Sequence, residues 1–195
     1  MKNSAAAITS IVRTIDQLQQ AYAVRAVVFM GEQVCPYDEE YDGNDLCATH
    51  FIARVDGHIV GTLRVRFFAN FAKLERLAVL PASRGYGVAA QLVTDALLHI
   101  QQKGYASFQL HAQTRFVRFW SKWARVSSKC DQFAFSDHEY VVMHGSLPAT
   151  ASSLSQDTDP MILNRPEGEW AKPGVLEASQ CRRPKSHNHQ CEGAI

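Results

Sequence analysis

The stretch LAVLPASRGYGVAAQLV, Leu77–Val93, decides the fold, because it joins an apolar run to a helical pattern through a turn containing an arginine and two glycines. The apolar run stops at Pro81, and apolar residues recur at helical spacing from Val88 onward. A strand, a glycine-rich turn and a helix together direct a row of backbone N–H groups to one place, where the helix dipole adds positive potential. The stretch therefore predicts a phosphate-binding loop.

Two well-known phosphate loops do not fit this stretch. A P-loop requires Gly-Lys-Ser/Thr, whereas Gly87 is followed by Val-Ala. The dinucleotide pattern G-x-G-x-x-G/A matches at Gly85, Gly87 and Ala90, but it also needs an acid about 20 residues further on to hold a ribose hydroxyl. No Asp or Glu occurs from Ala96 to Cys130, so a nicotinamide cofactor is disfavoured.

A third pattern, R-x-x-G-x-A, is satisfied by Arg84, Gly87 and Ala89, and here the sequence resembles the GCN5-related N-acetyltransferases, the GNAT superfamily. LERLAVLP is similar to the fourth strand of that family, and FQLHAQTRFVRFWSKW to its fifth strand and following helix. VRAVVFMGEQVCPYDEEYDGNDLCATHF is similar to a GNAT subgroup that reads R-x-x-V-F-x-x-E-Q-x-C-P-Y and then an acidic D-G-x-D. The resemblance covers Ile8–Gly145. It implies a mixed α/β (α+β) fold, a central, twisted, mostly antiparallel sheet flanked by helices.

The resemblance also implies a co-substrate, acetyl-CoA or another acyl-CoA. In this family the loop cradles the pyrophosphate of coenzyme A, and the pantetheine arm pairs with the fourth strand. Glycines let the backbone approach a phosphate closely, and Arg84 adds a fixed positive charge. The residues expected to bind the coenzyme are Leu77, Ala78, Val79, Leu80, Arg84, Gly85, Tyr86, Gly87, Val88, Ala89, Phe119 and Trp120.

Acyl transfer to an amine needs a base, because an alkylammonium must lose a proton before it attacks. Glu75, on the strand that leads to the thioester site, is the first candidate, and His111 on the neighbouring strand is the second. Strand alternation predicts that Lys73, Glu75, Leu77 and Val79 share one face and that Arg76 lies on the other. On the alternative interpretation, Glu75 is a structural partner of Lys73 or Arg25, and His111 is a hydrogen-bonded core histidine.

The family pattern for the catalytic acid is absent. Many GNAT members have a tyrosine in the helix after the fifth strand, where it protonates the leaving thiolate. Here the pair is Phe119-Trp120, and an indole N–H is not a useful acid. The proton is then expected from water, from Tyr140, or from no group of the protein.

An acidic segment precedes the predicted sheet. No Lys or Arg occurs from Ala26 to Ala53, where six acids occur: Glu32, Asp38, Glu39, Glu40, Asp42 and Asp45. Arg25 lies on an otherwise apolar helix stripe, so we expect it to meet a carboxylate of this segment. In the family the segment lies beside the acceptor, and the residues assigned to it are Arg25, Glu32, Asp45 and His50. A cationic acceptor, such as a polyamine or a basic peptide N-terminus, is one hypothesis; acids that pair internally or face water are the other.

A basic segment follows the predicted fifth strand. Arg115, Arg118, Lys122, Arg125 and Lys129 recur at helical spacing and would form one continuous face if the helix extends that far. Such a face can be solvated, can contact nucleotide phosphates of the coenzyme, or can dock an acidic acyl carrier protein. The neutral total charge and the acidic segment disfavour nucleic acid.

The predicted elements are seven strands and three helices, all before residue 147. Asp56-Gly57 is a strong hairpin signal, and Gly104 is a natural helix stop. The predicted strands are Ile8–Arg13, His50–Val55, His58–Phe67, Lys73–Leu80, Phe108–Ala112, Phe133–Phe135 and Tyr140–His144, and the predicted helices are Ile15–Met30, Val88–Lys103 and Arg115–Ala124.

The composition indicates one domain, 1–147, and a largely irregular extension, 148–195, that is rich in proline and Ser/Thr. No apolar run approaches the ~20 residues of a membrane helix, so a cytoplasmic protein without a membrane partner is expected. Cys35, Cys47, Cys130, Cys181 and Cys191 contain no CxxC pair and are expected to be free thiols. Cys181, His187, His189 and Cys191 match no common zinc spacing, so no metal site is expected.

These inferences converge on an acyl-CoA-dependent N-acyltransferase, most simply an acetyltransferase, acting on a small-molecule or peptide amine in a direct ternary complex. No cysteine has a recognisable nucleophile setting, which disfavours an acyl-enzyme. Two alternatives stay open: a long-chain N-acyl synthase supplied by acyl carrier protein, and a catalytically degenerate module that binds acyl-CoA. A homodimer also stays open.

Overall fold

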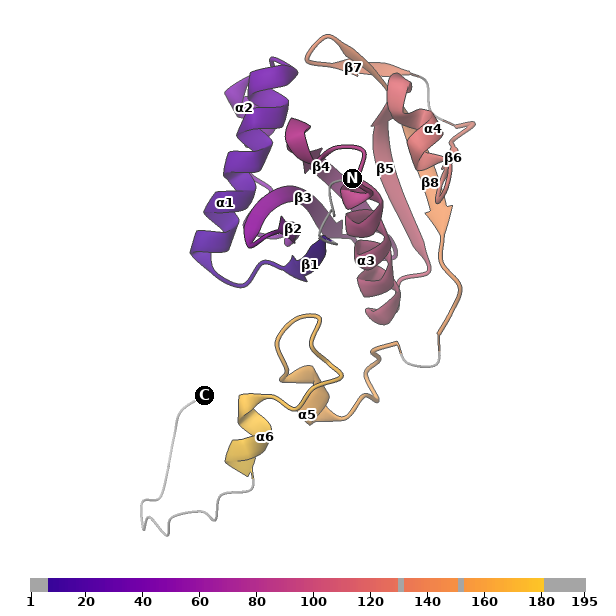
Figure 1. Cartoon of the computed structure of the whole chain (residues 1–195). Helices are drawn as coiled ribbons and strands as arrows, with labels where there is room; N and C mark the ends of the chain where they lie inside the picture. The colour runs from indigo at the N-terminus through magenta and orange to yellow at the C-terminus, as the bar shows by residue number, and fades with distance from the viewer. Residues whose placement is uncertain (1–6, 130–131, 151–152, 181–195) are drawn as a thin grey trace. The chain divides into compact units, whose positions relative to one another are not determined.

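The structure, a computed structural model, describes residues 7–129, 132–150 and 153–180. The chain divides into two compact units, one ending at Ser155 and the other beginning at Gln156. In the described part of the first unit, eight strands form a sheet in the order β1-β2-β3-β4-β5-β8-β6, with β7 paired to β8 (Figure 1). The strands are β1 Ile8–Ile11, β2 Thr49–Val55, β3 His58–Phe67, β4 Ala72–Val79, β5 Ser107–Gln113, β6 Arg125–Val126, β7 Phe133–Phe135 and β8 His138–Ser146.

The sheet is antiparallel except at its centre, where β4 and β5 run parallel. Their pairing is short and extends only from Ala72–Phe108 to Leu74–Leu110. On its other edge β4 remains paired with β3 as far as Val79. The second half of β4 therefore leaves β5, and the two strands diverge in Figure 1. We call this gap in strand pairing the β4–β5 opening.

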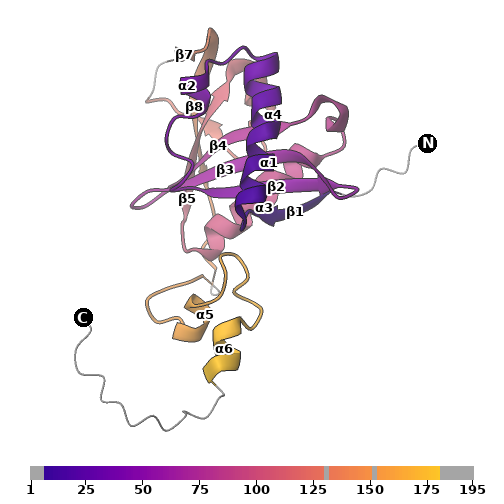
Figure 2. The same cartoon turned by 90° about the vertical axis from the view of Figure 1, so that its left-hand side faces the viewer.

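Helices cover both faces of the sheet. Helix α3 (Val88–Gln102) packs its apolar stripe, which includes Leu92, Val93 and Ile100, into the larger hydrophobic cluster. Helix α1 (Ile15–Arg25) begins at Thr14, whose side chain accepts a hydrogen bond from the Gln17 N–H. It continues as the π-helical segment η1 (Ala26–Glu32), and the short helix α2 (Tyr37–Glu40) follows. Figure 2 shows α1 lying across β2, β3 and β4 on the face opposite α3.

The mixed α/β architecture and the main elements are as predicted. The hairpin between β2 and β3 turns at Asp56 and Gly57, with φ of 51° and 81°, the pair of positive values that a two-residue hairpin loop requires. The helix predicted over Ile15–Met30 is α-helical only to Arg25 and π-helical beyond it.

The basic helix predicted after the fifth strand is wrong. The chain forms a 3-10 turn, η3 (Thr114–Phe116), and one short helix, α4 (Val117–Trp120). Arg125 then enters strand β6 and pairs with His144 of β8. The basic residues consequently do not share one helical face. The reason is tertiary: pairing with β8 replaces local helix formation once Trp120 is buried in the core.

The predicted alternation along β4 is also wrong, because a β-bulge lies at Arg76. This residue has a φ of 52°, and β4 advances three residues from Glu75 to Ala78 while β3 advances two from Arg64 to Thr62. Leu77 therefore packs with the cluster beneath α3, whereas Glu75 lies with Arg64 on the α1 face. Arg76 reaches the acidic segment on that same face.

The described part of the second unit contains α5 (Pro160–Leu163) and α6 (Val175–Gln180). The Asp159 side chain caps α5, and Arg165 forms an ion pair with Glu177. Cys130 and the cysteine–histidine group at Cys181, His187, His189 and Cys191 lie outside the described residues. Across the described ranges, every helix is too short or too polar to cross a membrane.

Candidate active site

The predicted phosphate loop joins β4 to α3. The 3-10 turn η2 (Pro81–Ser83) leads to Gly85 and Gly87, which have φ of 83° and 82°. A Cβ added at either glycine would meet nothing within 4 Å, so the space in front of the helix is open. Gly87 is the N-cap residue of α3 and provides no side-chain cap for its first N–H groups. The loop thus presents uncapped donors at the positive end of a helix of 15 residues.

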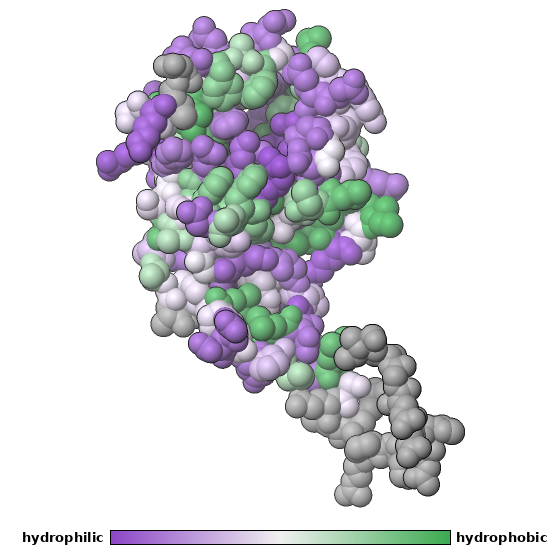
Figure 3. Space-filling model, turned by 180° about the vertical axis from the view of Figure 1, so that it is seen from behind, coloured by the Kyte–Doolittle hydropathy of each residue, from purple (hydrophilic) through white to green (hydrophobic). Residues whose placement is uncertain are grey.

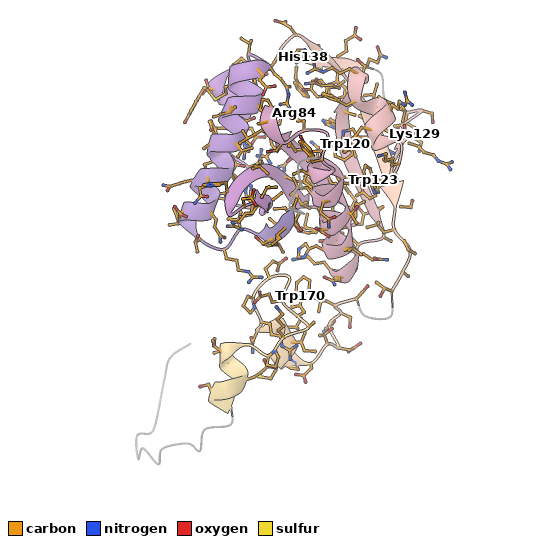
Figure 4. The ribbon with its side chains drawn as sticks, viewed as in Figure 1. Arg84, Trp120, Trp123, Lys129, His138 and Trp170 are labelled. Carbon is orange, nitrogen blue, oxygen red and sulfur yellow. The ribbon has the colours of Figure 1, made fainter. Side chains whose placement is uncertain are left out.

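Arg84 ties this loop to the segment after α1. Its Nε donates to the Val79 carbonyl at 3.0 Å, and its Nη2 donates to both carboxylate oxygens of Glu32 at 2.9 and 2.8 Å. The Arg84 side chain is 46% exposed, so it remains within reach of solvent and ligands. In Figure 4 it lies within the first unit, between helix α1 and strand β5.

The other residues expected at the coenzyme differ in exposure. Most of their side chains pack inward, so only their backbones can face a ligand, while Tyr86 is 59% exposed. Trp120 is buried in the cluster beneath α3, with Phe119 packed against it. Buried or partly buried in this way are Leu77, Ala78, Val79, Leu80, Val88, Ala89, Phe119 and Trp120.

On the α1 face, four arginines, one lysine and four carboxylates form one ion network, whose members are buried or partly buried. Its centre is Arg64, which is fully buried and contacts Asp42 at 2.7 Å, Asp45 at 3.0 Å and Glu75 at 2.9 Å. Arg25 lies between Glu40 and Asp45, at 2.5 and 2.6 Å. The remaining pairs join Arg66 and Lys73 to Glu75, and Arg76 to Glu40 and Asp42. The network binds the acidic segment to β3 and β4.

The network keeps Glu75 ionised. Burial alone would raise the pKa of Glu75, but the hydrogen bond from Arg66 and the charges of Arg64 and Lys73 outweigh it and lower that pKa to about 2. The pKa of Asp45 is lowered in the same way, because hydrogen bonds from Arg25 and Arg64 outweigh its burial. A carboxylate held this strongly by cations is a weak proton acceptor.

The expectation that Arg25 meets a carboxylate of the acidic segment is confirmed. Arg25, Asp45 and His50, assigned from sequence to the acceptor, are 0%, 8% and 4% exposed. His50 Nε2 lies 3.0 Å from the Asp45 carbonyl oxygen, and burial lowers the pKa of this histidine. Glu32, the fourth assigned residue, holds Arg84. The three buried residues therefore fix the acidic segment in place and do not line an exposed surface.

His111 lies on the same face as Glu75. Its neighbours on β5, Leu110 and Ala112, point into the cluster beneath α3, so the intervening His111 points to the opposite side. Burial and the nearby charge of Lys73 lower the pKa of His111 to about 4 against a smaller opposite effect of Glu75. His111 is only partly buried, and its imidazole is neutral near pH 7.

Tyr140 lies opposite Gln113 in the β5–β8 ladder, and its hydroxyl oxygen accepts a hydrogen bond from Gln113 Nε2 at 3.0 Å. The same amide nitrogen donates to Gln33 Oε1 at 2.7 Å, which links β5 to the segment after η1. In the turn between β7 and β8, the Ser136 hydroxyl donates to the Glu39 carboxylate, and its oxygen lies 3.4 Å from Cys35 Sγ. Seen from behind, the surface of the first unit is hollowed in its upper half (Figure 3).

Sequence reasoning missed Gln113, Gln33 and Ser136. Gln33 belongs to the E-Q-x-C-P-Y motif, which gave it no role, and no motif contains Gln113 or Ser136, which are placed by the register between β5 and β8 and by the turn after β7. Cys35 and Cys47 are free thiols, as predicted. Within the described ranges, no group of three or more His, Cys, Asp or Glu side chains could hold a metal ion.

Comparison with known proteins agrees with this geometry. Residues 15–123 match the model of the acetyltransferase (GNAT) family. The chain belongs to the GNAT family. Two Bacillus subtilis strain 168 relatives are each 36% identical to it: a candidate acetyltransferase over 109 residues, covering 54% of this chain and 74% of the relative, and the uncharacterized N-acetyltransferase YjcF over 113 residues, covering 57% and 80%.

The GNAT fold itself is shared with solved structures. A Pseudomonas aeruginosa acyl-CoA N-acyltransferase superposes with a TM-score of 0.66 at 23% identity, covering 72% of this chain and all of that one. As a GNAT protein, this chain is an acetyltransferase-family member for which acetyl-CoA or another acyl-CoA is the expected group donor.

Proposed function

We propose that this protein transfers an acyl group, most simply acetyl, from acyl-CoA to a primary amine by direct attack in a ternary complex. The observation that carries the proposal is the β4–β5 opening, which lies between an uncapped helix N-terminus and a face with a neutral imidazole and a phenol. Two reactants held on either side of one opening gain the rate advantage of fixed orientation. The proposal includes a cytoplasmic location and a small-molecule or peptide acceptor.

The donor side uses backbone groups. The pantetheine arm adds to the free edge of β4 along Leu77–Leu80, and the N–H groups of 85–89 receive the pyrophosphate. Arg84 supplies a positive charge beside them. A backbone N–H of β4 donates to the thioester carbonyl oxygen as negative charge develops there.

On the acceptor side, His111 takes the proton. The amine nitrogen attacks the thioester carbon, the C–N bond forms, and its proton passes to His111 directly or through one water. The C–S bond breaks, and the coenzyme thiolate receives a proton from Tyr140, whose hydroxyl oxygen already accepts from Gln113. The products are an amide and free coenzyme A thiol. Glu75 acts as a positioning residue, because three cations hold its carboxylate.

The carrier-protein alternative loses its main support, because the basic residues after β5 do not share a helix face. The degenerate binding module differs from the proposed enzyme only in turnover.

Thermal unfolding with coenzyme A, acetyl-CoA and longer acyl-CoAs tests the donor side, since a ligand at 100 times its Kd stabilises the folded protein by about 2.7 kcal/mol. Release of free thiol with a library of amines then tests turnover.

We expect stabilisation by acetyl-CoA and amine-dependent thiol release. Absence of stabilisation by every coenzyme would overturn the proposal. Stabilisation without thiol release for any amine would instead establish the binding module.

A further inference from the structure

Four rings form an aromatic wall beside the opening. The wall consists of His111, Phe133, Phe135 and Tyr140, whose successive ring centroids lie 5.0 to 6.1 Å apart. Phe135 is 50% exposed, and the other three rings are partly exposed. Exposed rings in mutual contact form a preorganised apolar surface whose faces also attract cations such as an ammonium group.

The aromatic wall lies on the same face of the sheet as Lys73 of β4 and Arg66 of β3, which we call the cationic floor. Lys73 lies opposite Gln109 in the parallel ladder, and Gln109 and His111 point the same way along β5. Lys73 also approaches Glu75 at 2.9 Å. The apolar surface and the cationic floor are therefore neighbours on the acceptor side of the opening.

One positive charge of this floor is not balanced. Arg66 and Lys73 both have Glu75 as their only acidic partner among the described residues, so two cations share one carboxylate. Arg64, which also contacts Glu75, shares Asp42 with Arg76 and Asp45 with Arg25, so the network as a whole holds five cations and four carboxylates. Arg66 and Lys73 retain 19% and 16% exposure, so an anionic group can reach them.

Five of the six acids that suggested a cationic acceptor are already engaged, and the sixth, Asp38, is a single exposed carboxylate. Glu32 holds Arg84, and Glu39 accepts from Ser136. Glu40, Asp42 and Asp45 belong to the ion network. A polyamine would have to break these pairs, whereas an anion would complete the charge balance at Lys73.

We propose that the acceptor is a small amine that also carries a carboxylate and an apolar side chain, as α-amino acids with aromatic or branched aliphatic side chains do. The carboxylate binds at Lys73 and Arg66, the apolar side chain packs on Phe133 and Phe135, and the amine faces His111. This inference rests on the proposed function and specifies its substrate class.

The test compares four acceptors at saturating acetyl-CoA: phenylalanine, phenylalaninamide, alanine and spermidine. Thiol release gives kcat and KM for each. We expect KM for phenylalanine to be about tenfold lower than for the amide, which lacks the carboxylate, and about tenfold lower than for alanine, which lacks the ring. Better turnover of spermidine than of phenylalanine, or equal KM values for all four, would overturn the inference.

Variants then test separately the contact of the substrate carboxylate and the contact of its apolar side chain. Phe135→Ala is expected to raise KM for phenylalanine about tenfold and to leave KM for alanine unchanged. Lys73→Met is expected to remove the difference between phenylalanine and its amide. Leu98→Ala is the matched control, because Leu98 is 51% exposed on α3 and outside the site. An equal effect of Leu98→Ala and Phe135→Ala on KM would contradict the role of the wall.

Calorimetry separates the proposed function, acyl transfer from acyl-CoA, from the proposed substrate class. Coenzyme A is titrated into the protein first, and phenylalanine is titrated into the coenzyme-saturated protein. If coenzyme A binds but phenylalanine neither binds nor reacts, the substrate class is wrong while the donor side stands. If coenzyme A itself does not bind, the proposed function fails, and the substrate class fails with it.

Discussion

His111 and Glu75 lie on the same face of the sheet, and their surroundings give them different chemistry. Three cations hold the Glu75 carboxylate and keep its pKa at about 2. For His111, partial burial and the nearby charge of Lys73 lower the pKa to about 4. A proton acceptor is most effective when its pKa is nearest the working pH, so His111 is the better base of the two.

We predict that His111→Gln lowers kcat/KM about 100-fold without changing the Kd of acetyl-CoA, because glutamine cannot take up the proton. In the native protein, His111 is neutral above its pKa and becomes charged as the pH falls through about 4. The pH profile should therefore show an acid limb near pH 4 that is missing from the variant. Steady-state thiol release between pH 3.5 and 8 measures both effects.

His144→Gln is the control for this experiment, since His144 is exposed on β8 and contacts Gln109. An equal loss in both variants would argue against a special role of His111. If Glu75→Gln removes the acid limb and His111→Gln does not, Glu75 is the base after all.

At the scale of elements, the loop before α3 combines two uses of glycine. Gly87 needs a positive φ to start the helix, and its missing side chain leaves the space in front of the helix open. Gly57 in the β2–β3 hairpin has a similar positive φ and the same empty surroundings, but it belongs to a hairpin turn and not to the loop that starts α3.

We predict that Gly87→Ala and Gly57→Ala each lower the free energy of unfolding by about 1 kcal/mol, because alanine is strained in this backbone region. Only Gly87→Ala should also weaken coenzyme A binding, by at least about tenfold, since its methyl group enters the space reserved for the phosphates. Urea unfolding and calorimetric titration of both variants provide the comparison. Equal coenzyme affinity in the two variants would place the pyrophosphate elsewhere.

Sequence patterns predict elements well where the local chemistry decides them. The Asp56-Gly57 hairpin and the glycine loop before α3 follow from backbone preferences that act within a few residues. The bulge at Arg76 and the early end of α4 depend on strands β3 and β8, which are distant in sequence. A periodic pattern does not contain that information, so both predictions failed.

At the scale of the whole molecule, the first unit extends past the last strand to Ser155. Residues after Leu147 close the C-terminal end of α3. Gln101 Nε2 donates to the Pro148 carbonyl at 2.7 Å, the Ser153 hydroxyl donates to the Gln101 carbonyl at 3.0 Å, and the Leu154 N–H donates to the Gln102 carbonyl at 2.8 Å. Two of these bonds satisfy carbonyls that a helix end leaves without intrahelical partners.

We predict that a chain ending at Ser155 is more stable than one ending at Leu147 by about 2 kcal/mol, because the shorter chain loses these three hydrogen bonds. Both chains contain the site, so their coenzyme affinities should agree. Urea unfolding of the two truncated proteins tests this. Identical midpoints would show that the segment after Leu147 contributes nothing to the first unit.

The ion network is the part of the site that sequence could suggest but not assemble. The isolated Arg25 and the block of acids indicated a pairing, which the structure contains. The choice of Arg64, Arg66 and Arg76 as further partners depends on how β3 and β4 align. That alignment also turned an expected acceptor pocket into a buried structural support.

The sheet is joined at its middle by three residue pairs between β4 and β5. Both strands begin at or one residue before this ladder; beyond Leu74 and Leu110 they no longer pair, while β4 stays paired with β3 and β5 with β8, so a strand position is left between them. On the proposed function, a thioester carrier would pair along this position, so its binding and release would extend and shorten the strand pairing of the sheet. We therefore expect amide hydrogen exchange in β4 to slow when the carrier binds and to recover on its departure, in step with turnover.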